Sequence, residues 1–277
     1  MAEYIGEYRL GLGVMSRPES ASEQIKLFKK VGWDGFFTGW DKAMTPEWSR
    51  LAREENMEYQ SIHSPFIGVN NLWKGNEEGD RIREALIDCA RDCARHEIPI
   101  MIIHPYIGFN FDEYVPTEAG IENYGKIIAE AERLGIKLGF ENVEGEPFLE
   151  AIIKTFKDSP AVGFCLDTGH EQCYNLGKDM LALYGDKLCH THLNDNMGSL
   201  GEVITHLDDY HLVMGDGIVD WKATMSRIRK TGYSGLIMCE LTQSIRPGVE
   251  KLIEYSKMPT EVFVTFALMR AREVVKL

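Results

Sequence analysis

Eight short apolar segments, each separated from the next by a stretch with helical spacing, constrain the fold of this 277-residue chain more than any other feature. Segment 162–166, for example, reads Val-Gly-Phe-Cys-Leu and is followed at once by Asp167. Short, continuous apolar runs are typical of strands that are buried on both faces of a parallel sheet. The eight expected strands are 9–14, 35–38, 58–62, 100–103, 136–140, 162–166, 188–193 and 236–239.

Between these segments, apolar side chains recur at the spacing of an amphipathic helix, as at Ile25, Phe28 and Val31. The expected helices are 21–31, 46–56, 79–96, 118–134, 147–156, 179–184, 220–231 and 260–275. Strands that alternate with helices, without a hairpin signal, predict a parallel sheet closed as a (β/α)8 TIM barrel, with residues 1–277 in one domain. A doubly wound open sheet is the competing fold. The first strand is not followed by Gly-x-Gly-x-x-Gly, which counts against a dinucleotide-binding version.

The composition, 44% hydrophobic and 26% charged, is that of a globular protein with a sizeable core. No apolar run is long enough to span a membrane, and the N-terminus lacks the features of a secretory signal. The six cysteines show neither disulfide nor metal spacing, so we expect a cytoplasmic protein with reduced thiols. The net charge of −13, without a basic run, makes nucleic acid an unlikely partner. The oligomeric state stays open, a homo-oligomer included.

Six of the expected strands have a histidine or an acidic residue at or near their C-terminal end. These residues are His63, His104, Glu141, Asp167, His192 and Glu240. In a barrel the C-terminal strand ends converge on one mouth, where burying six such groups is costly unless a divalent cation compensates them. Imidazole and carboxylate ligands without thiolates suit Zn²⁺, Mn²⁺, Co²⁺ or Fe²⁺ better than Ca²⁺. His190 is expected one layer deeper than His192, as a supporting group of the substrate-binding site.

The loop 194–217 is longer than most connections in a barrel and contains Asp209 and His211 in Asp-x-His spacing. From an extended segment, both side chains could reach one cation. The alternatives are a polar loop without a site, or ligation by His206, which lies in the same loop. His96 ends a helix and is expected to be a surface or capping residue.

Short motifs around these residues occur in a fixed order along nearly the whole chain. They are His63-Ser-Pro, His104-Pro, Glu141-Asn, Asp167-Thr-Gly-His170, His192-Leu-Asn-Asp, Asp209-Tyr-His211, Gly215-Asp-Gly217 with Asp220-Trp221, and Glu240. This set resembles the xylose isomerase-like TIM-barrel superfamily, which includes sugar phosphate isomerases and epimerases and the endonuclease IV enzymes.

The resemblance implies two overlapping sets of metal ligands. In the isomerase and epimerase members one metal is held by residues that correspond to Glu141, Asp167, His192 and Glu240. In the endonuclease members a three-zinc cluster adds the counterparts of His63, His104, His170, Asp209 and His211, with Glu141 bridging. All nine positions are kept, so the expected cofactor is one to three divalent ions, with zinc or manganese favoured.

Three functions follow as hypotheses. The leading one is a metal-dependent isomerase or epimerase of a sugar or sugar phosphate, in which Glu141 and Glu240 move a proton through an enediolate. The second is hydrolysis of a phosphate ester by a multi-metal, endonuclease IV-like site, and the third is a metal- and sugar-binding protein without catalysis. The loop after the third strand suits a lid over a small substrate, with Trp73 against a sugar face and Lys74 near a phosphate or carboxylate. Ordinary loop packing is the alternative for this pair.

Overall fold

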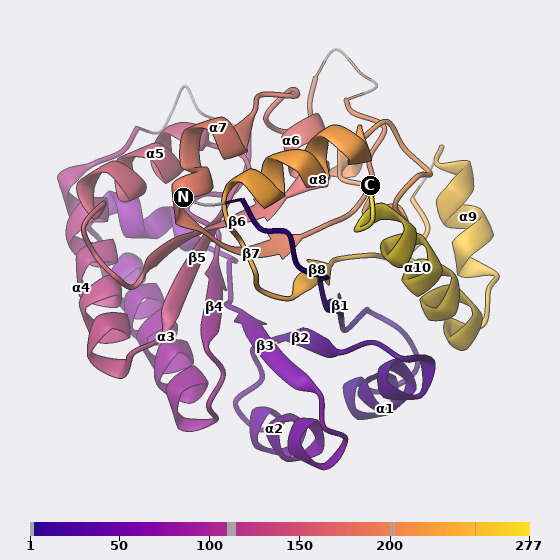
Figure 1. Cartoon of the computed structure of the whole chain (residues 1–277). Coiled ribbons are helices and arrows are strands. Elements are labelled where there is room, and N and C mark those ends of the chain that lie inside the picture. The colour runs from indigo at the N-terminus through magenta and orange to yellow at the C-terminus, as the bar shows by residue number, and fades with distance from the viewer. Residues whose placement is uncertain (1–2, 110–114, 200, 202, 247) are drawn as a thin grey trace.

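A computed structural model describes residues 3–109, 115–199, 201, 203–246 and 248–277. Its eight strands form one parallel sheet in the order β7-β6-β5-β4-β3-β2-β1-β8 (Figure 1). The strands are β1 (Leu10–Gly13), β2 (Gly35–Gly39), β3 (Glu58–His63), β4 (Ile100–Ile103), β5 (Lys137–Glu141), β6 (Val162–Asp167), β7 (Leu188–His192) and β8 (Ile237–Cys239). Each overlaps an expected strand, so the prediction of a (β/α)8 barrel is confirmed.

The seam between β7 and β8 closes the barrel with few backbone bonds. A single parallel bridge joins Leu193 to Cys239, and the amide of Leu193 donates to the carbonyl oxygen of Met238 at 2.8 Å. The hydroxyl of Thr191 takes the place of a further ladder bond, since it accepts from the amide of Met238 at 2.9 Å. The C-terminal ends of all eight strands therefore open on one mouth.

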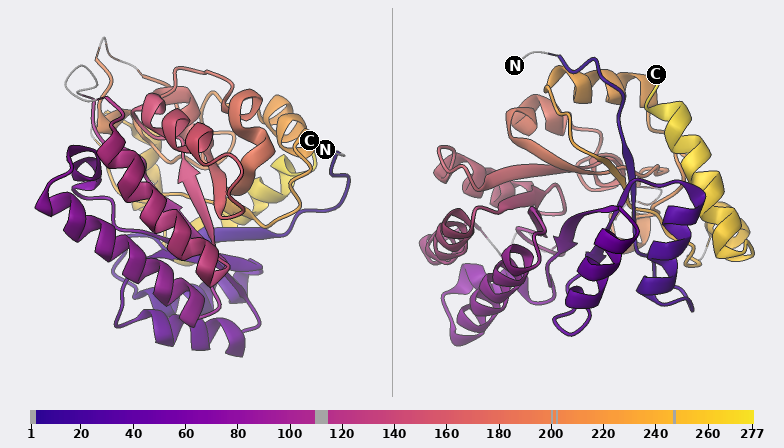
Figure 2. Two further views of the ribbon diagram at one scale, coloured as in Figure 1. Left: turned by 90° about the vertical axis from the view of Figure 1, so that its left-hand side faces the viewer. Right: turned by 60° about the horizontal axis from the view of Figure 1, so that its bottom comes forward.

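Helices cover the outside of the barrel (Figure 2). They are α1 (Ala21–Val31), α2 (Thr45–Glu54), α3 (Glu77–Arg95), α4 (Glu118–Leu134), α5 (Glu146–Thr155), α6 (Thr168–Cys173), α7 (Met180–Tyr184), α8 (Trp221–Lys230), α9 (Glu250–Ser256) and α10 (Thr260–Val274), with 3-10 turns η1 (Val69–Lys74), η2 (Gly185–Lys187) and η3 (His206–Asp208). The short elements α6, α9 and the 3-10 turns were not predicted, because elements of one or two turns show too few residues for a periodic pattern.

Local signals explain where the longer helices begin and end. At the start of α1 the Ser20 hydroxyl accepts from the amide of Glu23, whose carboxylate accepts from the amide of Ser20 at 2.7 Å. A capping interaction of this kind stabilises a helix by about 1 kcal/mol. The helix ends at Gly32, whose φ of 107° is favourable only for glycine.

The main core lies between the sheet and the helices, and two small apolar clusters fill the barrel itself. One cluster contains Phe37, Leu236 and Met238. The other contains Ile100, Ile102 and Cys165. These side chains lie inside the barrel, so the polar groups at the mouth rest on an apolar floor rather than on a water-filled channel.

No helix in the described part of the chain combines the length and the apolar character that crossing a membrane would require.

Candidate metal centre

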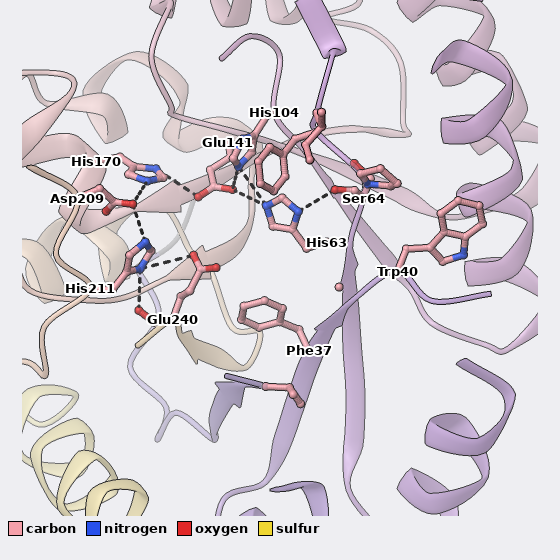
Figure 3. Close-up of a pocket in the computed structure, with 15 residues that line it drawn as sticks. Phe37, Trp40, His63, Ser64, His104, Glu141, His170, Asp209, His211 and Glu240 are labelled. Atoms are coloured by element: carbon pink, nitrogen blue, oxygen red, sulfur yellow. Dashed lines mark hydrogen bonds and ion pairs between the residues drawn. The ribbon is translucent and has the colours of Figure 1, made fainter. Parts of the chain in front are cut away.

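Glu141 is the centre of the polar cluster at the mouth of the barrel (Figure 3). It is the last residue of β5, and its side chain is fully buried. Its Oε2 lies 3.6 Å from Nε2 of His63 and 3.2 Å from Nε2 of His104. Its Oε1 lies 3.1 Å from Nδ1 of His192 and 3.4 Å from Nδ1 of His170. Four imidazoles, three from strand ends and one from α6, thus surround one carboxylate.

Three groups of side chains at the mouth bring possible ligand atoms within 4.8 Å of one another. They are His63, His104 and Glu141; then Glu141, Asp167, His192 and Glu240; and then His170, Asp209 and His211. Together they contain all nine residues that the resemblance singled out as metal ligands. Cys165 lies against the same cluster in a further group with Glu141 and His192, beneath the mouth and inside the barrel.

The orientation of His63 and His211 favours metal binding. Nδ1 of His63 lies 2.9 Å from the carbonyl oxygen of Ser64, and Nδ1 of His211 lies 3.1 Å from that of Glu240. A carbonyl oxygen can only accept, so in both rings Nδ1 carries the proton and Nε2 is the atom presented to the cluster. Hydrogen bonds of this kind orient metal-binding histidines.

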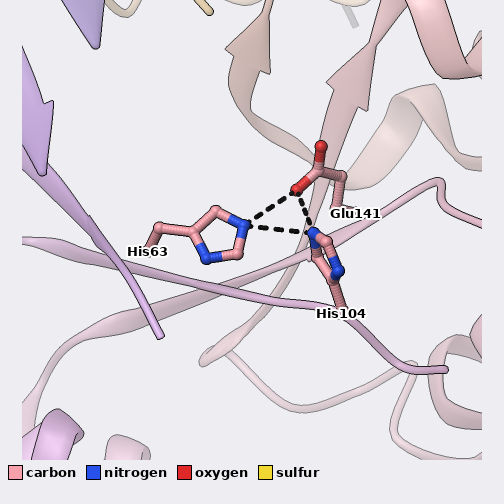
Figure 4. A group of neighbouring side chains, drawn as sticks. All are labelled: His63, His104 and Glu141. Atoms are coloured by element: carbon pink, nitrogen blue, oxygen red, sulfur yellow. Dashed lines mark hydrogen bonds and ion pairs between the residues drawn. The ribbon is translucent and has the colours of Figure 1, made fainter. Parts of the chain in front are cut away.

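The first group brings three potential hydrogen-bond acceptors close together (Figure 4). Nε2 of His63 lies 3.1 Å from Nε2 of His104, and both face the same oxygen of Glu141. Among the described residues, no donor meets this oxygen with hydrogen-bonding geometry. Two imidazole lone pairs and a carboxylate oxygen repel one another unless a proton or a cation lies between them.

In the second group two carboxylates flank one imidazole. Nδ1 of His192 lies 3.1 Å from Oε1 of Glu141 and 3.1 Å from Oε2 of Glu240. Asp167 completes the group: its Oδ1 caps α6 by accepting from the amide of His170 at 2.7 Å, and its Oδ2 accepts from the side-chain amide of Asn194 at 2.8 Å. Burial raises the pKa of Asp167 to about 6, although the charge of His170 opposes that shift.

The third group joins α6 to the long loop after β7. Oδ2 of Asp209 lies 2.7 Å from Nε2 of His211 and 3.5 Å from Nε2 of His170. Burial alone would lower the pKa of His211, but the carboxylates of Asp209, Glu240 and Asp167 together outweigh burial and raise that pKa to about 9. In the absence of a cation, a proton on His211 thus compensates the buried carboxylate.

The donors at the mouth therefore fit divalent metal ions. Nitrogen and oxygen atoms converge from eight segments of the chain, and buried acceptors such as Oδ1 of Asp209 have no hydrogen-bond partner among the described residues. The mixture of histidine and carboxylate groups suits zinc or manganese. The residues that the sequence pattern singled out as ligands thus lie close together in the folded chain.

Two asparagines that sequence reasoning missed fix the strand ends. The side chain of Asn142 donates to the carbonyl oxygen of Asp167 at 2.8 Å and accepts from its amide at 2.7 Å. Asn194 reaches Asp167 from β7, and a Cβ atom on Gly169 would lie 2.0 Å from Oδ1 of Asn194. The available signal was their position, since each follows a ligand within two residues in the motifs around Glu141 and His192.

Asp195 was also missed, and it organises the long loop. Its buried carboxylate accepts from the amides of Asn196, Gly215 and Val219 and from the indole N–H of Trp221, at distances of 2.7 to 3.0 Å. Asp195 and Leu212 also exchange two backbone hydrogen bonds. The loop that bears Asp209 and His211 is therefore anchored at both ends, whereas its residues 200 and 202 lie outside the described part.

A cavity of about 510 Å³ opens above the cluster, within the usual size range of small-molecule sites. One side is formed by the metal-centre residues, and the other side by apolar side chains. The apolar lining comprises Val14, Phe37, Trp40, Pro65, Phe66 and Ile67. Two of these rings stack on histidines of the cluster: the ring centre of Phe37 lies 4.8 Å from that of His192, and the ring centre of Phe66 lies 4.9 Å from that of His104.

Neither Trp73 nor Lys74 takes the predicted position at the cavity. Trp73 is only 2% exposed, its indole N–H donates to the carbonyl oxygen of Pro105 at 2.8 Å, and its ring packs against Tyr124 and Phe148. The 3-10 turn η1 places this ring in the core between helices, so it does not line the cavity. Lys74, at the end of η1, is exposed and does not line the cavity either.

His190 lies beneath the site, as its position two residues before His192 predicted. It is fully buried, its Nε2 lies 3.2 Å from the Ser61 hydroxyl, and its ring lies 5.1 Å from that of His192. Burial holds its pKa well below the usual range, so the ring is neutral. His190 does not line the cavity, so it does not contact a substrate there and instead packs beneath His192. His96 is the C-cap of α3, as expected.

Comparison with known proteins places this arrangement in a family. Residues 25–257 match the family described as xylose isomerase-like TIM barrel. The uncharacterised protein MJ1311 of Methanocaldococcus jannaschii is 28% identical over 222 residues, which cover 72% of this chain and 71% of that protein.

Two solved structures with the same fold are sugar epimerases. D-psicose 3-epimerase from Clostridium cellulolyticum superposes with a TM-score of 0.69 and 14% identity, over 96% of this chain and 99% of that chain. The 3-keto-D-glucoside 4-epimerase of E. coli superposes with a TM-score of 0.71 and 18% identity, over 96% and 100%. These identities establish a common fold, and the family match covers most of the sequence. The chain belongs to the xylose isomerase-like TIM barrel family.

Proposed function

We propose that this protein is a metal-dependent isomerase or epimerase of a sugar or a sugar derivative. The observation that carries the proposal is the second ligand group, in which Glu141 and Glu240 each lie 3.1 Å from Nδ1 of His192 beside a cavity of small-molecule size. Together with Asp167, these side chains would hold a divalent ion. When bound, such an ion supplies Lewis-acid polarisation of a carbonyl and so acidifies the neighbouring C–H.

The two glutamates are placed to move that proton. Both line the cavity, but the side chain of Glu240 is 26% exposed whereas that of Glu141 is 0% exposed. We assign removal of the proton to one carboxylate. We assign delivery of a different proton, on the other face of the enediolate, to the second carboxyl group, which acts in its protonated form. Acid–base catalysis by a positioned side chain contributes about 10²–10⁴-fold to a rate.

The two sides of the cavity suit a sugar, which has hydroxyl groups at its edge and C–H groups on its faces. Phe37, Trp40 and Phe66 offer apolar surface opposite the ligand atoms. We therefore propose that these three rings contact a face of the sugar. The sequence had suggested this role for Trp73. The epimerase activities of the two structural neighbours are compatible with this substrate class.

The test is hydrogen exchange at the carbon next to the carbonyl. Protein loaded with Mn²⁺ or Zn²⁺ is incubated with a panel of ketoses in D₂O, and deuterium incorporation is followed by NMR. Glu240→Gln is expected to lower the exchange rate at least about 10²-fold, whereas Glu150→Gln, on the surface of α5, leaves it unchanged. Exchange that survives Glu240→Gln at the wild-type rate removes Glu240 from the mechanism.

A second candidate, hydrolysis of a phosphate ester, is favoured by one observation. The first and third ligand groups adjoin the second, so side chains for three ions lie within one mouth. Two observations argue against DNA as the substrate. The net charge is −13, and no Lys or Arg is found among the described residues that line this cavity. Salt-sensitive nicking of abasic duplex by the metal-loaded protein would support this candidate, and loaded protein that does not nick would exclude abasic DNA as its substrate.

A further inference from the structure

A second, smaller cavity adjoins the metal centre on the side of β1 and β8. It has a volume of about 200 Å³ and shares Val14, Phe37, His211 and Glu240 with the larger cavity, so the two lie side by side. Its other lining residues lie in the segments that follow β1 and β8, and they include Ser16, Thr242 and Arg246. A substrate bound at the metal centre could therefore extend into this cavity.

Arg246 gives the smaller cavity a chemistry that the larger one lacks. Among the described residues that line either cavity, it is the only Lys or Arg. Its side chain is partly buried, and one guanidinium nitrogen donates to the carbonyl oxygen of His206 at 2.6 Å. No carboxylate in the described part of the chain forms an ion pair with it. A guanidinium has five N–H donors, so several remain for a ligand.

The contact with His206 also ties Arg246 to the metal centre. His206 begins η3 in the same loop that bears Asp209 and His211, and the amide of Thr242 donates to the carbonyl oxygen of His211 at 3.2 Å. The arginine is thus held by the segment that supplies metal ligands. An arginine held in place beside hydroxyl groups is the usual recognition site for an oxyanion, because its planar fork matches two oxygens at once.

We propose that this cavity is an anion subsite, and that the substrate of the proposed isomerase carries a phosphate or carboxylate group at the end distal to its carbonyl. The proposal rests on the proposed function and narrows its substrate class. It also moves the anion-binding role from Lys74, which does not line either cavity, to Arg246.

Three hexuloses with one carbon skeleton test the proposal: D-fructose, D-fructose 6-phosphate and D-fructuronate. Their affinities for the Mn²⁺-loaded protein are measured by calorimetry, which does not depend on turnover. We expect at least one anionic probe to bind about 10–100-fold more tightly than D-fructose, the effect of a hydrogen-bonded charge pair. Which of the two binds better distinguishes phosphate from carboxylate.

Arg246→Ala is expected to abolish this preference while it changes the affinity for D-fructose by less than about twofold. Arg246→Gln serves as a second variant of similar size, and metal content verifies that each variant keeps its centre. Arg81→Ala removes an exposed arginine of α3 as a matched control. A wild-type protein without preference for either anionic probe, or a preference that survives both Arg246 substitutions, overturns the subsite.

The two proposals fail in different ways. If Arg246 governs anion binding but no ketose exchanges its α-hydrogen, the isomerase reaction is wrong and the subsite stands. If exchange occurs with equal efficiency for neutral and anionic probes in wild type and Arg246→Ala, the reaction stands and the subsite is wrong.

Discussion

Replacing Asp195 with alanine is expected to loosen the loop that carries two proposed metal ligands, Asp209 and His211, without unfolding the barrel. The carboxylate accepts four hydrogen bonds, and three of its donors belong to buried residues, Asn196, Val219 and Trp221. Each buried donor left without an acceptor costs roughly 1–2 kcal/mol if water reaches part of the space. The sum, roughly 3–6 kcal/mol, is a large share of the roughly 5–15 kcal/mol that stabilises a typical protein.

The assay combines urea unfolding with metal content. The free energy of unfolding of Asp195→Ala should be lower than that of the wild type by roughly 3–6 kcal/mol. The variant should also fail to bind an ion at the group of His170, Asp209 and His211. Asp220→Ala is the matched control, because Asp220 caps α8 in the same segment and its loss should cost only about 1 kcal/mol. The anchoring role of Asp195 would be refuted by two results together: Asp195→Ala loses no more stability than Asp220→Ala, and it keeps its full metal content.

Two further predictions concern the centre itself. Gly169→Ala should lower metal affinity and stability, because its Cβ would lie 2.0 Å from Oδ1 of Asn194; wild-type values in metal titration and thermal unfolding would contradict this. Binding of an ion to the third group should release a proton from His211 at pH 7–8, since the raised pKa of about 9 keeps the ring protonated in metal-free protein and ligation requires it neutral. Calorimetry in buffers of different ionisation enthalpy measures the protons released. His211→Ala should reduce their number without abolishing the release, since the pKa of His170 is also raised.

The strand ends explain why much of the site could be predicted. The residue after an apolar run, such as Glu141 after 136–140, lies at the barrel mouth whatever the details of packing. The closed barrel then brings together residues as distant in sequence as His63 and Glu240. Pattern and topology suffice for this step, because the position of a strand end depends on the sheet and not on neighbouring side chains.

The features that the sequence did not predict have a different physical origin. The short 3-10 turn η1 directs the ring of Trp73 into the core instead of the cavity. So short a turn has no periodic pattern in the sequence by which it could be predicted. Asp195 and Asn142 act on backbone groups that become neighbours only in the folded chain, so in sequence they look like ordinary loop polar residues. The short helix α6 was missed because its N-cap, Asp167, is also the last residue of a strand.

The central claim is that the buried imidazoles and carboxylates at the barrel mouth are a metal centre. Metal content and stoichiometry, measured on protein purified without added metal and again after loading, test it most directly. We expect at least one tightly bound divalent ion per chain. Glu141→Gln should reduce this metal content, because Glu141 contributes to two of the ligand groups. One ion would favour the isomerase, and three would favour the phosphoesterase. Protein that binds no divalent ion before or after loading would contradict the account.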